Sequence, residues 1–252
     1  MIRVNNLIKK YTPQVTALDN VSFEINKGEI CGYIGTNGAG KTTTVKILIG
    51  ALEYDSGEVF IEGINVKEKP VDVKKIIGYV PESANLFNSL TASEYLDFIG
   101  TIHEIKKVTL KKRVDYFAEL FGFTEHLQEA IGILSKGNKQ KVLITSALFH
   151  DPDVLFFDEP LSGLDANSIF VFQDIVSTLA SKNKTIFYCS HLLDTIEKIS
   201  TKIILLENGK VKFDKKIDEL KHSKDFTSLE NLFRSMKSDS EIKRFSYEDI
   251  FN

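Results

Sequence analysis

Apolar residues recur along the chain in short runs, and the period of these runs changes from one segment to the next. Where they alternate with polar residues, or form short uninterrupted runs between turn-forming residues, they predict β-strands. In the first third of the chain, strands are expected at residues 2–11, 20–25, 29–34 and 76–80, and a turn followed by a strand at residues 53–63. Residues 41–52 instead have helical spacing, and this helix is expected to end near Gly50.

Between residue 81 and about residue 134 the strand pattern disappears. Thr91 and Glu94 have the spacing of a capping box, which predicts a helix start, and residues 95–105 follow with apolar residues at helical spacing. Residues 110–123 predict an amphipathic helix whose apolar face is formed by Val114, Phe117, Ala118 and Phe121. A helical block is therefore inserted into a chain that otherwise contains strands.

From Ser135 onward helices and strands alternate again. Helices are expected at residues 139–150, 167–181, 192–200 and 228–236, and strands at residues 153–158 and 185–190, with a hairpin at residues 202–214. Several strands are apolar on both faces, which is typical of a central parallel sheet covered by helices. The chain is predicted to be an α/β protein, and residues 237–252 are expected to be loosely held.

Composition narrows the classes of partner. The 252 residues include 42% hydrophobic and 27% charged residues, with a net charge of -3 and a pI near 6.0, so we expect no nucleic-acid partner. Lysines cluster at residues 106–113, where a solvated helix face is the simple explanation. Cys31 and Cys189 lie in strand-like runs and are expected to be buried thiols in a reducing compartment. We expect no signal peptide, no membrane span and a cytoplasmic protein.

A glycine-rich loop follows the strand at residues 29–34 and opens the next helix. Its residues are Gly35, Thr36, Asn37, Gly38, Ala39, Gly40, Lys41 and Thr42, which fit the phosphate-binding P-loop pattern. Glycine lets backbone N–H groups surround a phosphate, and the start of the helix adds partial positive charge. Lys41 is expected to reach the β- and γ-phosphates of a nucleotide, and the Thr42 hydroxyl to bind Mg²⁺. The alternative is a glycine-rich turn with an incidental lysine.

A second candidate feature is the pair of acids at the end of the apolar strand 153–158. Asp158 lies where this strand ends, at the edge where parallel sheets bind ligands, and is expected to hold Mg²⁺ through water. Glu159 follows and is expected to orient and deprotonate the attacking water. A solvated acidic loop is the alternative, and the P-loop argues against it.

The order of these parts resembles the ATP-binding cassette (ABC) ATPases over about residues 2–235. The diagnostic segment is Leu134–Gln140, "LSKGNKQ", where the family has a signature that begins Leu-Ser and continues Gly-Gly-Gln. Ser135 and Gly137 match, whereas Lys136 and Asn138 depart from the usual form. Read without the family, Ser135 is an ordinary N-cap of a helix.

The resemblance implies further site residues. Ser135 and Gly137 would contact ATP bound to a second subunit, so that two subunits in a homodimer or heterodimer enclose two ATP molecules. The segment Ser162–Asp165 matches the loop that crosses this interface, with Asp165 as its acid. Further nucleotide contacts are implied for His191 at the γ-phosphate, Tyr11 at the adenine, where simple packing is the alternative, and Thr43. Glu82 replaces the usual glutamine near Mg²⁺ or the attacking water.

The same resemblance implies a fold and a function. The fold is a P-loop NTPase core at residues 1–236, with an N-terminal antiparallel β subdomain, an inserted α-helical subdomain at about 83–134, and a tail at 237–252. The function is that of an ATPase subunit on the inner face of the cell membrane, which drives export of drugs, antibiotics or bacteriocins through a separate polytopic permease. Leu86 and Phe87 are candidates for permease contact, with core packing as the alternative. A soluble ATPase associated with ribosomes or assembly is the alternative function.

Overall fold

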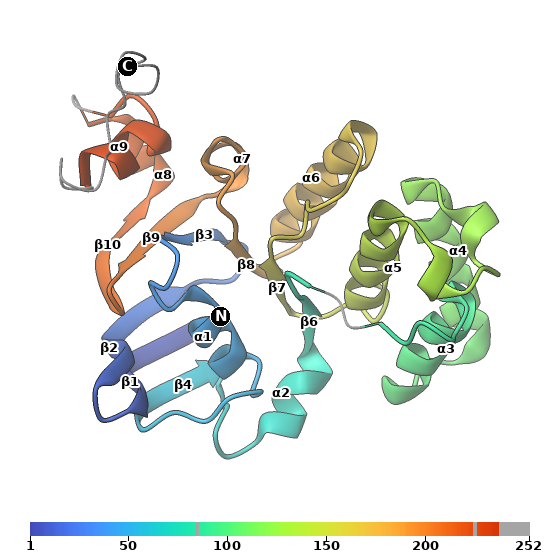
Figure 1. Cartoon of the computed structure of the whole chain (residues 1–252), viewed down its shortest axis with the longest axis horizontal. Helices are drawn as coiled ribbons and strands as arrows, with labels where there is room; N and C mark the ends of the chain where they lie inside the picture. The colour runs from blue at the N-terminus through green and yellow to red at the C-terminus, as the bar shows by residue number, and fades with distance from the viewer. Residues whose placement is uncertain (84–85, 224–225, 237–252) are drawn as a thin grey trace, which may run out of the picture.

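The computed structural model of the chain describes residues 1–83, 86–223 and 226–236, and Figure 1 shows two β-sheets with helices around them. The smaller sheet is antiparallel and has four strands in the order β2-β1-β4-β5. Its strands are β1 (Ile2–Thr12), β2 (Val15–Ile25), β4 (Ser56–Ile61) and β5 (Ile64–Asn65). This sheet is the antiparallel β subdomain expected at the N-terminus.

The larger sheet has six strands in the order β10-β9-β3-β8-β7-β6. Its strands are β3 (Ile30–Gly35), β6 (Ile77–Val80), β7 (Val154–Asp158), β8 (Thr185–Cys189), β9 (Lys202–Glu207) and β10 (Lys210–Lys216). All neighbouring pairs are parallel except β9 and β10, which form the expected hairpin. Because β3, β8 and β7 are parallel neighbours, the segments that follow them leave the sheet at one edge.

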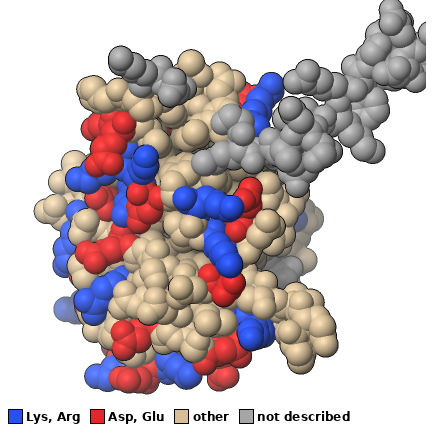
Figure 2. All heavy atoms as spheres, turned by 90° about the vertical axis from the view of Figure 1, so that its left-hand side faces the viewer, with Lys and Arg blue, Asp and Glu red and all other residues tan. Residues whose placement is uncertain are grey.

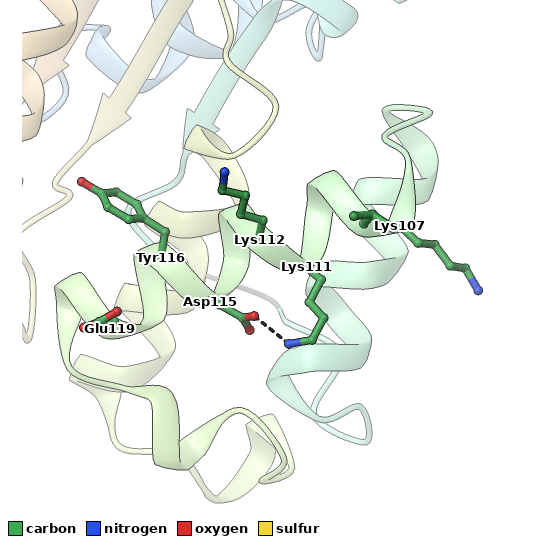
Figure 3. Close-up of a pocket in the computed structure, with 7 residues that line it drawn as sticks. Lys107, Lys111, Lys112, Asp115, Tyr116 and Glu119 are labelled. Carbon is green, nitrogen blue, oxygen red and sulfur yellow. Dashed lines mark hydrogen bonds and ion pairs between the residues drawn. The ribbon is translucent and has the colours of Figure 1, made fainter.

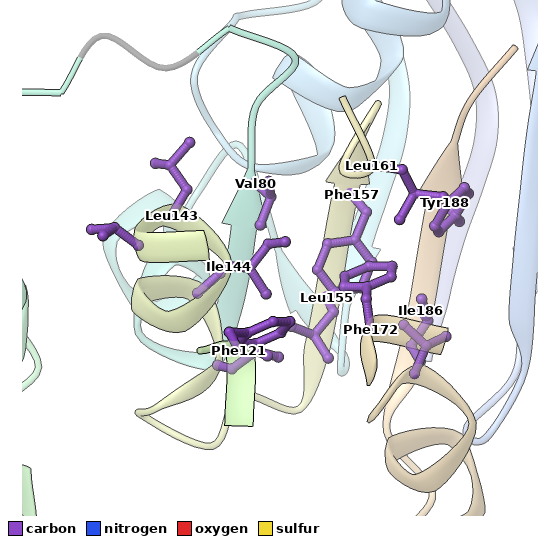
Figure 4. Close-up of a cluster of buried hydrophobic side chains, with 14 of the residues drawn as sticks. Val80, Phe121, Leu143, Ile144, Leu155, Phe157, Leu161, Phe172, Ile186 and Tyr188 are labelled. Atoms are coloured by element: carbon purple, nitrogen blue, oxygen red, sulfur yellow. The ribbon is translucent and has the colours of Figure 1, made fainter. Parts of the chain in front are cut away.

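The strands of the larger sheet are apolar on both faces because each face covers a separate core. In β7, Val154 and Phe156 pack toward the small sheet and helix α1 (Lys41–Leu48). Leu155 and Phe157 point the other way, into the core beneath the remaining helices (Figure 4). The prediction of a central strand covered on both sides is confirmed for this segment.

Most of the helices contribute to the core on the second face of the larger sheet. These are α3 (Ala92–Ile102), α4 (Lys107–Phe121), α5 (Lys136–Leu148), α6 (Ala166–Ser181), α7 (Leu193–Ile199), α8 (Ile217–Lys221) and α9 (Leu229–Met236). Two short 3₁₀ turns, Thr124–His126 and Ile131–Ile133, link α4 to α5. In Figure 1, α3, α4 and α5 gather on the side away from the small sheet. Of these, α3 and α4 belong to the inserted helical part, and α5 follows it in the chain.

The start of the helical part agrees with its sequence pattern. Thr91 caps α3 in a complete capping box with Glu94. Val114, Ala118 and Phe121 are buried along α4, and Phe117 packs against the same core. This apolar face packs α4 against α5 and α6, which in turn contact the sheet.

The structure corrects the sequence prediction just before β6. Helix α2 (Pro70–Ile76) was not expected, and it contains Ile76, which had been assigned to the next strand. With only one buried side chain, Val73, this short helix has little apolar pattern of its own. The expectation for residues 237–252 lies outside the described residues.

The cysteines, the surface charges and the helix lengths bear on the expected type of protein. Cys31 and Cys189 are buried and free, as predicted. On the face that Figure 2 shows, basic and acidic side chains are interspersed. None of the helices in the described part of the chain combines the length and apolar character needed to cross a membrane.

Candidate functional site

The glycine-rich loop connects β3 to α1 and has a geometry that requires glycine. Gly38 and Gly40 have φ angles of 78° and 109°, in the left-handed region. A Cβ on Gly40 would lie 2.6 Å from the carbonyl oxygen of Ala17 on β2. The tight approach brings β2 against the loop, and α1 begins at the next residue, Lys41. The first N–H groups of α1 have no partner within the helix, so they are free to bind an anion.

The Lys41 side chain lies across this loop. Its Nζ donates hydrogen bonds to the carbonyl oxygens of Gly35 at 2.7 Å and Thr36 at 3.1 Å. The ammonium group is therefore held over the loop that is expected to surround phosphate. This position agrees with the role predicted for Lys41, which stays a prediction.

The loop forms one wall of a cavity of about 850 Å³. The cavity is lined by Tyr11, Val15, Thr16, Ala17, Asn37, Gly38, Gly40, Lys41, Thr42, Thr43, Glu82, Asp158, Glu159 and His191. Gly35 and Thr36 line an adjoining cavity, and Ala39 is buried beneath the loop. Residues from β1, the P-loop, β7 and the loop after β8 thus meet at one place.

Asp158 ends β7 at the bottom of this cavity and is only 4% exposed. Burial, together with the nearby carboxylates of Glu82 and Glu159, raises the pKa of its carboxyl to about 6, and Lys41 and Lys46 oppose the shift. Burial of the Tyr79 side chain, together with the charge of Asp158, raises the pKa of Tyr79 to about 12. The site therefore contains more negative charge than its lysines neutralise.

Glu159 is held in an unusual conformation by the loop after β8. Its φ is 50°, and its backbone N–H donates to the carbonyl oxygen of Cys189 at 2.9 Å. Its carboxylate accepts hydrogen bonds from the Ser190 hydroxyl and the His191 N–H, both at 2.8 Å. The Nδ1 atom of His191 also lies 2.8 Å from this carboxylate. A left-handed glutamate costs conformational energy, and the loop contacts maintain it.

Tyr11 lies at the mouth of the cavity, and its side chain is 54% exposed. Its hydroxyl is 3.2 Å from that of Thr43, and the Lys9 ammonium lies 5.6 Å from the ring centroid. The ring face is thus partly covered by a lysine in the same strand. Adenine stacking on Tyr11 stays a prediction.

Three predicted nucleotide contacts outside the P-loop also do not line this cavity. Ser135 caps α5 by accepting a hydrogen bond from the Asn138 N–H at 3.1 Å. Asp165 caps α6 through the Ser168 N–H at 2.9 Å. Gly137 packs against the backbone of Gly163. One copy of the chain does not bring these residues into its own cavity.

The cavity fits Mg²⁺ bound in the way this ion prefers. Thr42, Asp158 and Glu82 line it and offer oxygen atoms, and the raised pKa of Asp158 indicates negative charge that a divalent cation would offset. Among the described residues, no group of three or more His, Cys, Asp or Glu side chains is arranged to hold a metal. Such a site suits Mg²⁺, which binds through a few protein oxygens and completes its shell with water and phosphate.

Two surface features of the helical part bear on the candidates for partner contact. A hollow of about 640 Å³ over α4 (Figure 3) is lined by Lys107, Val108, Lys111, Lys112, Asp115, Tyr116 and Glu119. Lys111 pairs with Asp115 at 2.6 Å, as on a solvated helix face. Near Glu82, Leu86 is buried, whereas Phe87 is 55% exposed. Core packing therefore accounts for Leu86, and only Phe87 is available at the surface.

Sequence reasoning missed the partners that hold the site residues in place. Ser190 is 2% exposed and bonds Glu159, but a serine after a strand carries no specific signal. Lys141 is 8% exposed and pairs with Asp165 at 3.0 Å. The sequence feature that could have revealed Lys141 is a charged residue within the apolar face of a predicted helix.

The chain is similar to known proteins in sequence and fold. A family model described as ABC transporter matches residues 18–162. The chain is 33% identical over 222 residues to the ABC transporter ATP-binding protein NatA of Bacillus subtilis (strain 168), covering 88% of this chain and 90% of that protein. It is also 33% identical over 222 residues to the bacitracin transport ATP-binding protein BcrA of Bacillus licheniformis, covering 88% and 71%.

A solved structure described as the dimeric structure of MJ0796, a bacterial ABC transporter cassette, has the same fold. The TM-score is 0.79, the sequence identity is 26%, and the match covers 86% of this chain and 99% of that chain. The likeness confirms the α/β core with its antiparallel sheet and inserted helices.

Proposed function

The chain belongs to the ABC transporter family of ATP-hydrolysing subunits, and we propose that two such subunits close on bound ATP and so power export through a separate membrane permease. The observation that carries the proposal is the cavity in which the P-loop meets Asp158, Glu159 and His191. In this proposal residues 1–236 form the ATPase domain, the helical subdomain lies near residues 83–134, and the subunit lies on the inner face of the cell membrane.

The residues around the cavity have distinct roles in hydrolysis. The P-loop amides and Lys41 bind the β- and γ-phosphates, and Tyr11 and Thr43 contact the nucleoside side of the ligand. Thr42, Asp158 and Glu82 would hold Mg²⁺, which neutralises phosphate charge when it is bound. His191 contacts the γ-phosphate from the loop after β8.

Glu159 is the general base of this proposal. Its carboxylate takes a proton from water as the water oxygen bonds to the γ-phosphorus and the bond to the ADP oxygen breaks. Ser190 and the His191 N–H orient the carboxylate from one side. The left-handed backbone of Glu159 is consistent with strain maintained at a functional residue.

A second subunit would complete the site. Ser135, Gly137 and Asp165 lie at the starts of α5 and α6, outside the cavity of their own subunit. The start of α5 is a suitable anion-binding position for a nucleotide held by a partner. The dimeric cassette of similar fold supports this arrangement.

The permease is proposed to bind the helical part near Glu82. Phe87 and Phe98 are 55% and 45% exposed and meet edge to face at 5.8 Å between ring centroids. Exposed, adjacent aromatic rings of this kind mark a protein contact surface. Export is favoured because the chain is similar to a bacitracin transport protein.

The ATPase role is tested with two substitutions. Lys41→Ala is expected to abolish ATP binding, and the matched control Lys46→Ala, an exposed lysine on the same helix, is expected to retain it. Glu159→Gln is expected to bind ATP but stop hydrolysis and trap an ATP-bound dimer in light scattering. Unchanged nucleotide affinity in the first variant, or undiminished turnover in the second, contradicts the assigned roles.

The transport role is tested by site-directed crosslinking. Both native cysteines are buried, so Phe87→Cys introduces a reactive thiol at the proposed contact. In native membranes we expect this thiol to crosslink to an integral membrane protein, and Val71→Cys, on the exposed side of α2, not to do so. A crosslink to a ribosomal or other soluble component would instead establish the non-transport alternative.

A further inference from the structure

The loop that follows β7 is fastened to α5 at successive points. The Gln140 side-chain amide donates to the carbonyl oxygen of Pro160 at 2.8 Å. A Cβ on Gly137 would lie 2.6 Å from the carbonyl oxygen of Gly163, so the two backbones are in direct contact. The side chain of Lys136 lies against the other face of Gly163. The loop therefore follows α5 closely over more than one turn.

An ion pair is the last contact between α5 and the loop. Lys141 Nζ lies 3.0 Å from Asp165 Oδ2, and Lys141 is 8% exposed. Among the described residues, Asp165 supplies the carboxylate within ion-pair distance of this ammonium. A buried ammonium requires such a partner, because desolvation without one is costly.

The carboxylate of Asp165 makes three contacts inside its own subunit, although its side chain is 55% exposed. Oδ1 accepts from the Ser168 N–H at 2.9 Å, and Oδ2 accepts from the Ser168 hydroxyl at 2.7 Å in addition to Lys141. These contacts hold the pKa of Asp165 well below its usual range, with the bonds from Ser168 as the main cause. Asp165 therefore joins the start of α6 to α5 within one subunit.

Helix α5 and the loop after β7 carry residues of two different ATP sites. Ser135 begins α5 and, under the proposed function on which this step rests, faces the ATP of the partner subunit. Glu159 begins the loop and acts on the ATP of its own subunit. Any force on Ser135 therefore reaches Glu159 through α5 and the loop only if the two remain fastened together.

We propose that Lys141 is a positioning residue that couples the two ATP sites of the dimer, by tying the loop of residues 159–165 to α5 through Asp165. The ion pair makes Ser135 and Glu159 parts of one rigid unit. Occupation of one site then promotes the catalytic arrangement of the other, which appears as cooperativity in ATP hydrolysis.

The test compares the ATP dependence of hydrolysis in three proteins. The wild type is expected to show a Hill coefficient approaching about 2, the number of sites in the dimer. In Lys141→Met it should fall to about 1 with an unchanged Kd for ATP in the monomer, and Lys141→Arg should restore it. Lys184→Met is the matched control, because Lys184 pairs with Asp151 and Asp153 at the opposite end of β7.

A merely structural role would lower thermal stability in Lys141→Met and in Lys184→Met and leave the Hill coefficient of the folded protein unchanged. Asp165→Asn provides a second measurement if Lys141→Met folds poorly, because asparagine still caps α6 but carries no charge. It should also lose cooperativity, and the double variant should lose no more than either single one.

The possible outcomes distinguish the coupling role of Lys141 from the ATPase function itself. Cooperative hydrolysis that persists in Lys141→Met or Asp165→Asn overturns the coupling role and leaves the ATPase assignment intact. Wild-type hydrolysis without cooperativity also overturns the coupling role. Absence of ATP hydrolysis in the wild type overturns the proposed function and, with it, this inference.

Discussion

Asp158→Asn should make the protein more stable without nucleotide and should also impair its activity. The side chain is 4% exposed at the end of β7, and burial together with Glu82 and Glu159 raises its pKa to about 6. A carboxyl with a raised pKa in the folded state stabilises the fold at low pH, and this contribution is lost as pH rises through about 6. At pH 7.5 the charged carboxylate therefore opposes folding.

The expected gain in the free energy of unfolding follows from the pKa shift of Asp158. A shift from the ordinary value of 3.8 to about 6 corresponds to at most about 3 kcal/mol of destabilisation at pH 7.5. Water in the cavity screens part of this charge, so we expect Asp158→Asn to gain about 1 to 2 kcal/mol. For a chain of this length the gain should raise Tm by roughly 3 to 6 °C. At pH 5 the gain should be about half as large, because the folded carboxyl is then mostly protonated.

The assay is denaturation at pH 7.5 and pH 5 in the presence of EDTA and without nucleotide. Asp153→Asn is the control, since this acid precedes β7 at the opposite end and pairs with Lys184. ATP hydrolysis by Asp158→Asn with Mg²⁺ should fall sharply in the same preparation. A free energy of unfolding for Asp158→Asn that does not exceed that of the wild type at pH 7.5 would refute the role of Asp158 burial. An equal gain in this free energy at pH 7.5 and pH 5 would refute it as well.

Three other predictions concern the site and the core. Glu82→Gln should retain substantial ATP hydrolysis and move the acidic limb of its pH profile lower, because Glu82 raises the pKa of Asp158; complete loss of hydrolysis would show another role for the carboxylate. Burial, together with the stacked His103, lowers the pKa of His150 to about 4, so stability should fall from pH 6.5 toward pH 4. In denaturation at pH 7 and pH 5, His150→Asn should flatten this loss by about 1 kcal/mol, and an unchanged slope would count against it. Gly78→Ala should destabilise the fold by about 1 to 3 kcal/mol in thermal melts, since its Cβ would collide with the Ala147 carbonyl oxygen; an unchanged midpoint would contradict that packing.

The sequence alone predicted the features that depend on neighbouring residues. The P-loop could be recognised because phosphate binding requires glycines and a lysine at fixed local spacing, before a helix. The capping box at Thr91 and the apolar strand that ends at Asp158 were visible for the same reason. Helix α2 was missed because its seven residues bury little and run directly into β6.

Only the tertiary structure decided how distant residues meet. The order of the parallel strands places Ser190 and His191 beside Glu159, although 31 residues separate Ser190 from Glu159. Packing of α5 on the loop after β7 brings Lys141 to Asp165 and engages a carboxylate that motif reasoning assigned to a nucleotide. Burial at the end of β7 is the main cause of the raised pKa of Asp158, and Glu82 adds to it from a distant part of the chain. Short-range spacing encodes local elements, but contacts, burial and charge coupling arise only when strand order and helix packing bring remote segments together.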